Sequence, residues 1–242
     1  MMRRISLFAW VFALAAAAAR GEPAHYRSFT LAVEPWGIID TDRGVGPDFV
    51  RFLADQAGFA VTAESWPYLR VIDGMRTGEN AINLGIPTPE REKYGIAICS
   101  IGSVKVSLLY RAASGAKRDA ASSFSGMAVG ELRGSRTLDD FDRAVPHKKV
   151  LISDMSQGIR MLEAGRLDAT ICVRPGCGNI LDGQGGEVRG LAESRLTEQS
   201  LAIYVSRASP LSRDAAAMLR LRLACDSYAG RQEMRRLLAP FH

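Results

Sequence analysis

The alternation of strand and helix patterns along the chain is the feature that most constrains its fold. The segment "SFTLAVEPW", residues 28–36, predicts a strand, and apolar residues then recur at helical spacing from Pro47 to a stop at Gly58. A second strand is predicted at "FAVTA", residues 59–63. Strand, helix and strand joined by short links are typical of a parallel sheet covered by helices, so we place the chain in the α/β class.

The same alternation continues to the C-terminus, with one change of composition. A short helix from Leu69 closed by Gly78 and a buried strand at "AINLGI" are predicted next, followed by the strand "VKVSLLY". Residues 111–126 are rich in Ala, Ser, Gly and charge, which predicts a linker or an exposed loop. Beyond it we predict strands near residues 127–132, 148–153 and 201–206, a helix over 156–165 and a last helical element over 214–238.

The first 21 residues predict a cleavable signal peptide and therefore export to the periplasm. Arg3 and Arg4 precede about fifteen apolar residues, fewer than the roughly 20 that a membrane anchor needs. Three of the 31 Lys and Arg lie in this segment, which has no acid, leaving 28 basic against 26 acidic residues. An excess of two positive charges gives no support to a nucleic-acid partner.

The four cysteines receive two different interpretations. Cys172 and Cys177 flank a Pro-Gly turn in "CVRPGC", and we predict a disulfide between them in an exported protein. Cys99 and Cys225 lie in apolar contexts far apart in the sequence, and we interpret them as buried free thiols. The three histidines are scattered, so the sequence predicts neither a metal site nor a cofactor.

A set of motifs in a fixed order resembles the family 3 extracellular solute-binding proteins, the periplasmic receptors for polar amino acids and related solutes. The motifs are "GVGPDFVRFLADQAGF", Trp66 with Arg70, "GENAINLGIPTPERE", "GELRGS" and "MLEAGRLDATI". The resemblance implies a periplasmic binding protein type II fold, in which two α/β lobes joined by two crossing strands close on a ligand. Lobe one would contain residues 22–107 and 200–242, and lobe two residues 108–199.

The resemblance also implies that Arg91, in the Thr-Pro-Glu-Arg motif, holds a ligand carboxylate. The chemistry agrees, because a guanidinium offers a planar fork of donors to a carboxylate and keeps its charge when buried. Further ligand contacts are predicted from residues of the same loop, of neighbouring strand ends and of lobe two. These residues are Thr88, Glu34, Trp36, Trp66 and Ser135.

One position departs from the amino-acid receptors of the family. Where they carry an aspartate for the ligand ammonium, this chain has the apolar Val173 or its neighbour Arg174. Arg174 would favour a second anionic group, so a small carboxylate or dicarboxylate has equal standing with an amino acid.

Three functions remain open at this point. The first is a monomeric solute receptor that delivers a small anion to an ABC permease. The second is an accessory or sensor protein that does not transport. The third is a dehydratase-like enzyme with Glu34 or Asp154 as its acid, although the sequence has no paired carboxylates at defined spacing and no nucleophile with a base. We therefore expect a binding protein and not an enzyme.

Overall fold

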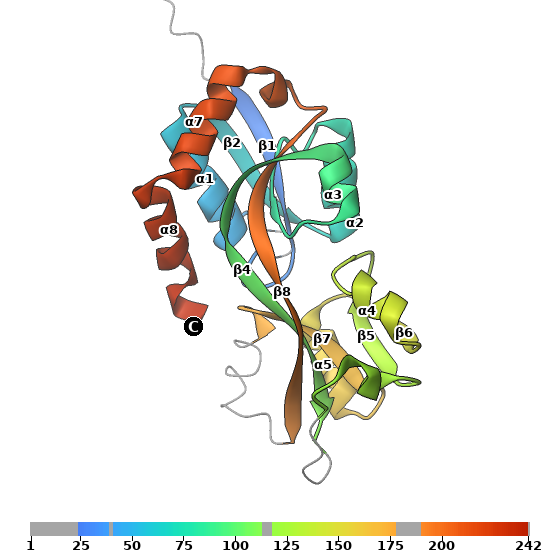
Figure 1. The fold of residues 1–242 in the computed structure, drawn as a ribbon. Coiled ribbons are helices and arrows are strands. Elements are labelled where there is room, and N and C mark those ends of the chain that lie inside the picture. The colour runs from blue at the N-terminus through green and yellow to red at the C-terminus, as the bar shows by residue number, and fades with distance from the viewer. Residues whose placement is uncertain (1–23, 39–40, 113–117, 178–189, 242) are drawn as a thin grey trace, which may run out of the picture.

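The computed structural model describes residues 24–38, 41–112, 118–177 and 190–241. The predicted signal peptide lies outside the described residues. All strands of the described part join one curled sheet in the order β2-β1-β3-β8-β4-β7-β5-β6. Two long antiparallel strands, β4 (Gly95–Arg111) and β8 (Leu191–Ser206), run side by side through both halves of the molecule (Figure 1). This is the α/β, two-lobed architecture that the sequence predicts.

Lobe one is a short parallel sheet with helices on both sides. In it, β1 pairs in parallel with β2 and β3, and β3 pairs antiparallel with β8. Helices α7 and α8 pack against α1, so the end of the chain returns to this lobe (Figure 1). The elements are β1 (His25–Leu31), α1 (Val45–Ala57), β2 (Ala60–Trp66), α2 (Tyr68–Thr77), β3 (Ile82–Gly85), α3 (Pro89–Tyr94), α7 (Ala215–Asp226) and α8 (Tyr228–Leu238).

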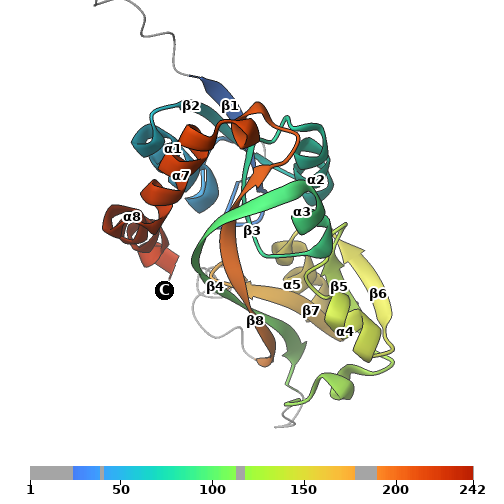
Figure 2. The same cartoon turned by 45° about the horizontal axis from the view of Figure 1, so that its top comes forward.

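Lobe two is smaller and repeats the same arrangement. Strand β5 pairs in parallel with β6 and β7, and β7 pairs antiparallel with β4. Figure 2 shows β4 and β8 leading from lobe one into this group. The elements are the short 3-10 helix η1 (Ala121–Phe124), β5 (Ala128–Leu132), α4 (Asp139–Ala144), β6 (Lys148–Ile152), α5 (Met155–Glu163) and β7 (Ala169–Arg174). Two further 3-10 helices, η2 (Pro210–Arg213) and η3 (Ala239–Phe241), belong to the C-terminal part of the chain. The predicted lobe boundaries fall inside β4 and β8, so they remain a prediction.

Several helix ends follow directly from local sequence. Gly58 and Gly78 end α1 and α2 in the left-handed conformation, with φ of 76° and 86°, which favours glycine. Asp154 begins α5 as its N-cap, accepting a hydrogen bond from the backbone N–H of Gln157 at 2.7 Å. The glycine stops at Gly58 and Gly78 were predicted from the sequence, whereas the cap at Asp154 was not.

Some predicted elements differ from the structure. The strand expected over residues 28–36 ends at Leu31, because the chain turns and the Trp36 N–H bonds back to the Val33 carbonyl at 2.8 Å. The last helical element is two helices, since Ser227 caps α8 through a 2.9 Å bond from Gly230 N–H. Within the expected linker, Phe124 is fully buried, so part of that segment belongs to the core of lobe two.

The cysteine assignment needs one correction. Cys172 and Cys177 are joined by a disulfide, as the sequence favours. Cys99 and Cys225 are also joined, so their interpretation as free thiols is wrong. The bond links β4 to α7 across 126 residues of sequence, and only the packing of α7 on β4 brings the two sulfurs together.

A partly buried ionic cluster lies in lobe two between β5, β6 and α4. His147 Nε2 lies 2.8 Å from Glu131 Oε1, and Lys149 Nζ lies 2.7 Å from the other oxygen of Glu131. Asp142 also contacts Lys149 and lies 3.5 Å from His147 Nε2. Burial acts to lower the pKa of His147, but bonds to the Val145 carbonyl and Glu131, together with both carboxylate charges, outweigh it and raise that pKa above 6.5.

Candidate functional site

Arg91 is held at the start of α3, where the chain leaves β3. Thr88 begins this helix as its N-cap, its hydroxyl accepting a hydrogen bond from the Arg91 backbone N–H at 3.2 Å, and Pro89 takes the first helical position. The Arg91 side chain runs back toward the end of β3, and the residue is only 2% exposed. The Thr-Pro motif therefore fixes the backbone of Arg91 and directs a full positive charge into the protein.

Three groups position the guanidinium. Its Nε donates to Asn83 Oδ1 at 2.7 Å, and its Nη1 donates to the backbone carbonyl of Ile86. The rings of Tyr68 and Tyr204 flank it, with centroids 5.8 and 5.9 Å from Cζ. Strand pairing brings the Tyr204 ring close to Arg91, because Tyr204 of β8 lies directly opposite Asn83 of β3.

Gly85 leaves the space that the guanidinium fills. A Cβ atom on this residue would lie 2.6 Å from Arg91 Cζ, closer than real Cβ contacts allow. The glycine in "LGIP" thus has a packing role, since it permits the arginine to lie flat against the end of β3.

No carboxylate within the described part of the chain pairs with Arg91. The ion pairs of that part involve other residues, and burial lowers the pKa of Arg91, with the neighbouring Tyr68, Tyr204 and Glu90 acting in the opposite direction. Of the five N–H donors of a guanidinium, two are used by Asn83 and Ile86, leaving three. A buried cation without an acid is costly unless an anion arrives to pair with it.

The free donors belong to a side chain that lines a cavity between the lobes. This inner cavity has a volume of about 60 Å³. Its walls are mostly aliphatic or aromatic and come from both lobes: Leu31, Val33, Trp36, Tyr68, Leu84 and Ile86 from lobe one, Leu132 and Val173 from lobe two, and Val104 and Leu201 from the crossing strands. An outer cavity of about 320 Å³ shares Leu31, Val33, Tyr68, Leu132 and Ser135 with it and adds Leu69, Arg133 and Ser153 among others.

Four hydroxyl groups complete the lining of the inner cavity. Ser135 and Thr137 of lobe two bond to each other at 2.7 Å. Thr30 Oγ1 and Tyr68 Oη are buried, and neither has a hydrogen-bond partner among the residues that the structure describes. Buried polar groups are nearly always paired, so two unpartnered hydroxyls on residues that line a cavity with Arg91 make this cavity the candidate ligand site.

The structure brings some of the predicted site residues together and separates others. Arg91, Trp36 and Ser135 line the inner cavity, whereas Thr88, Trp66, Glu34 and Arg174 do not. The Thr88 hydroxyl is used in the helix cap. Trp66 packs on Phe29 and Arg70, and the side chain of Glu34 is exposed.

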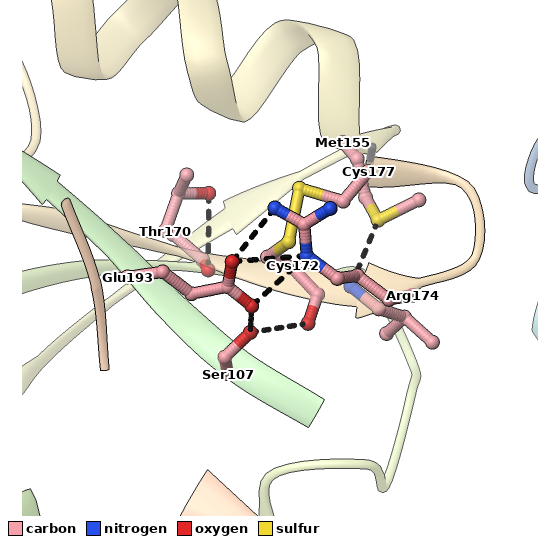
Figure 3. Close-up of a disulfide and its surroundings, with 9 residues drawn as sticks. Ser107, Met155, Thr170, Cys172, Arg174, Cys177 and Glu193 are labelled. Carbon is pink, nitrogen blue, oxygen red and sulfur yellow. Dashed lines mark hydrogen bonds and ion pairs between the residues drawn. A yellow bond between two sulfur atoms is a disulfide. The ribbon is translucent and has the colours of Figure 1, made fainter. Parts of the chain in front are cut away.

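Arg174 is engaged inside lobe two. Its Nη2 lies 2.7 Å from Glu193, whose other hydrogen bond comes from Ser107, and Figure 3 shows its guanidinium turned to that carboxylate beside the Cys172–Cys177 disulfide. Burial acts to raise the pKa of Glu193, but Arg174 and Ser107 outweigh it and hold that pKa below its ordinary value. The positive charge of Arg174 is therefore balanced by the protein.

The disulfide loop also brings the two lobes into contact. A Cβ on Gly176, whose φ is 130°, would lie 2.4 Å from the backbone carbonyl oxygen of Glu34, so the two loops touch. Farther along the cleft, Arg136 of lobe two lies 3.7 Å from Glu90 of lobe one. These contacts show that the two lobes touch at two places.

Sequence reasoning missed four residues that shape the site: Asn83, Tyr204, Thr30 and Tyr68. Asn83 carries a weak signal, since it is a polar residue within the otherwise apolar, buried strand β3. Thr30 carries less, since β1 holds several other polar residues. Tyr204 and Tyr68 carry none, because aromatic residues in such positions are ordinary core residues.

A metal centre has one candidate position among the described residues that is not a disulfide. Glu131, Asp142 and His147 place ligand atoms within 4.8 Å of one another. The ammonium of Lys149 already contacts both carboxylates, so this cluster is a protein-balanced set of charges.

Comparison with known proteins gives the fold. No family model matches the chain, and no curated protein matches its sequence. Solved structures do match: the substrate-binding protein of an amino acid ABC transporter has a TM-score of 0.71 at 14% identity, covering 90% of this chain and 99% of that one. The chain has the periplasmic binding protein type II fold. In its described part, no helix is long and apolar enough to cross a membrane.

Two further matches widen the range of roles found with this fold. The periplasmic VFT2 domain of BvgS from Bordetella pertussis has a TM-score of 0.67 at 16% identity, over 90% of this chain and 93% of that one. The ancestral amino acid-binding protein AncCDT-1, a precursor of cyclohexadienyl dehydratase, has a TM-score of 0.72 at 15% identity, over 90% and 95%.

Proposed function

We propose that this protein binds a small anionic solute between its lobes, with the solute carboxylate on Arg91. One observation carries the proposal: a fully buried guanidinium, with three unused N–H donors and no acidic partner among the described residues, lines a cavity between the lobes. An incoming carboxylate would supply the missing charge and accept two of the donors together.

The proposed role is that of a periplasmic receptor. The mature chain, following cleavage near residue 21, binds its solute as a monomer and presents the closed form to an ABC permease. Trp36 and Ser135 contact the solute from opposite lobes, so the solute gains contacts only when the lobes close, and that difference drives closure. The type of fold and the match to an ABC transporter substrate-binding protein support this role.

Binding is favoured over catalysis by the lining of the two cavities. No carboxylate, imidazole or thiol in the described ranges lines either of them. The two acids that the sequence offered are placed elsewhere, Glu34 on the surface and Asp154 in the N-cap of α5. General acid–base chemistry needs a proton donor within reach of the substrate, and neither residue provides it.

The test is calorimetric titration of the wild-type protein and three variants with carboxylates. Arg91→Ala should weaken binding by about 2 to 5 kcal/mol, because it removes one partner of a buried charge pair. Arg91→Lys keeps the charge but loses the fork, and should recover only part of that loss. Arg76→Ala is the matched control, since Arg76 is exposed and pairs with Asp73 on α2 away from the cavity.

Two results would count against the receptor. If Arg91→Ala binds a carboxylate as tightly as the wild type does, Arg91 is not the anchor. If the wild type binds no carboxylate and instead co-purifies with a protein partner, the accessory or sensor role replaces the receptor role, and the likeness to the BvgS domain would then be the better guide.

A further inference from the structure

We propose that the solute is a small 2-oxo monocarboxylate with an apolar aliphatic body, and not an amino acid or a dicarboxylate. This inference rests on the proposed function, because it takes Arg91 as the anchor of the carboxylate. It concerns the part of the ligand that lies beyond the carboxylate, which the charge, the walls and the hydroxyl groups of the cavity define.

The first argument is charge balance in the closed cavity. Arg91 is the one charged residue among the described residues that line the inner cavity. A monocarboxylate makes the closed complex neutral. A zwitterionic amino acid leaves a net positive charge, since its ammonium meets no carboxylate there, and a dicarboxylate leaves a net negative charge. Unpaired buried charge is strongly disfavoured, so only the monoanion matches the site.

The second argument concerns the other cations near the cleft. Arg174, which the sequence offered for a second carboxylate, is paired with Glu193 at 2.7 Å and does not line either cavity. Arg133 lines only the outer cavity and is exposed, so water already solvates its charge. A second anionic group would therefore gain little from either arginine.

The third argument is the shape and polarity of the walls. Apart from Arg91 and the hydroxyls, the inner cavity is surrounded by aliphatic and aromatic side chains of both lobes. Its volume is about 60 Å³, against the 10–15 Å³ or so that a single water requires on the same measure. The space takes a short carbon chain in contact with apolar walls, and the shared lining lets a longer chain extend toward the outer cavity.

The fourth argument assigns the oxygen at carbon 2. Thr30 Oγ1 and Tyr68 Oη are buried without a hydrogen-bond partner among the described residues, and both residues line the cavity with Arg91. A hydroxyl can donate to a keto oxygen adjacent to the carboxylate, which satisfies both the ligand and the protein. The two hydroxyls can therefore bind an uncharged oxygen at carbon 2, and no acid among the described residues that line the cavity could bind an ammonium there.

The experiment compares ligands that share one carbon skeleton. We would titrate the wild-type protein with 4-methyl-2-oxopentanoate, L-leucine, 4-methylpentanoate and 2-oxoglutarate. The first should bind at least about 100-fold more tightly than leucine, which has the same skeleton with an ammonium at carbon 2. It should also bind at least about 100-fold more tightly than 2-oxoglutarate, which adds a second carboxylate.

Two isosteric variants test the hydroxyl assignment. Tyr68→Phe and Thr30→Val each remove a hydroxyl while keeping the shape of the wall. Each variant should weaken the binding of 4-methyl-2-oxopentanoate about 10-fold. The affinity for 4-methylpentanoate, which lacks the oxygen at carbon 2, should be nearly unchanged. An equal loss for both ligands would place the hydroxyls on the carboxylate and overturn this assignment.

The failures of the two proposals can be told apart with Arg91→Ala. If leucine or 2-oxoglutarate binds more tightly than 4-methyl-2-oxopentanoate, and Arg91→Ala abolishes that binding, the proposed ligand class is wrong while the assignment as an anion receptor stands. If 4-methyl-2-oxopentanoate binds equally well to the wild type and to Arg91→Ala, the assignment of Arg91 as the anchor of the carboxylate is wrong. Absence of binding by all four ligands overturns the ligand class.

Discussion

Exchange of Asn83 for aspartate tests whether the charge of Arg91 is kept uncompensated for a ligand. Asn83 is fully buried, its Oδ1 accepts from Arg91 Nε at 2.7 Å, and its Nδ2 donates to the Phe29 carbonyl at 2.8 Å. Asn83→Asp is isosteric and places a carboxylate against the guanidinium. The protein would then supply the counter-charge that we assign to the solute.

The size of the effect follows from the geometry. The introduced carboxylate and the bound carboxylate would lie on different sides of one guanidinium, roughly 6 Å apart, which at an effective dielectric constant of about 20 costs about 3 kcal/mol of repulsion. We therefore expect Asn83→Asp to weaken the binding of 4-methyl-2-oxopentanoate by about 2 to 3 kcal/mol, or roughly 30- to 150-fold in Kd. Isothermal titration at constant ionic strength measures the change.

Asn80→Asp is the matched control. Asn80 is also fully buried and bonds to the same residue, accepting from Phe29 N–H at 2.7 Å, but it makes no bond to Arg91 and does not line the inner cavity. The introduced group has no cation beside it and would take up a proton, so Asn80→Asp should lower the melting temperature while sparing affinity. Equal affinity losses in the two variants, or unchanged affinity in Asn83→Asp, would refute the reasoning.

Three further predictions concern the packing around the site and the stability of the fold. Gly85→Ala should weaken carboxylate binding at least about 10-fold, because the new methyl would displace the guanidinium of Arg91, which now lies 2.6 Å from that position; titration showing wild-type affinity would contradict this. Replacing Cys99 and Cys225 together with serine should lower the free energy of unfolding by about 5 kcal/mol, which is the chain-entropy value for a loop of 126 residues. A decrease of less than about 1 kcal/mol in denaturant melts would show that the disulfide is not formed. The pKa of His147 is raised on folding, so its contribution to stability is complete below about pH 6.5 and is lost as pH rises through the raised value; melting temperatures from pH 5 to 9 should show this decline in the wild type and not in His147→Gln.

The order of elements could be predicted from the sequence, which also indicated Arg91 as the candidate anchor. Strand and helix periodicity, with glycine stops at Gly58 and Gly78, gave the α/β succession because these signals act over a few residues. Arg91 could be singled out because it follows the end of a predicted strand, where ligands bind in parallel sheets, and belongs to a motif that carries the family resemblance. The division of the C-terminal segment at Ser227 was missed, since a serine cap within a continuous helical pattern is a weak signal.

The surroundings of the anchor were decided by tertiary structure. Asn83 and Tyr204 meet Arg91 because β3 and β8 pair in one register, although about 120 residues separate them in the sequence. The same long-range packing joined Cys99 to Cys225 and gave Arg174 a partner in Glu193, removing it from the ligand site. Local patterns report which side chains are buried, whereas the partner of each buried charge depends on contacts between distant segments. That difference is why the sequence indicated a candidate cation, and only the folded chain showed that this cation has no acidic partner among the described residues.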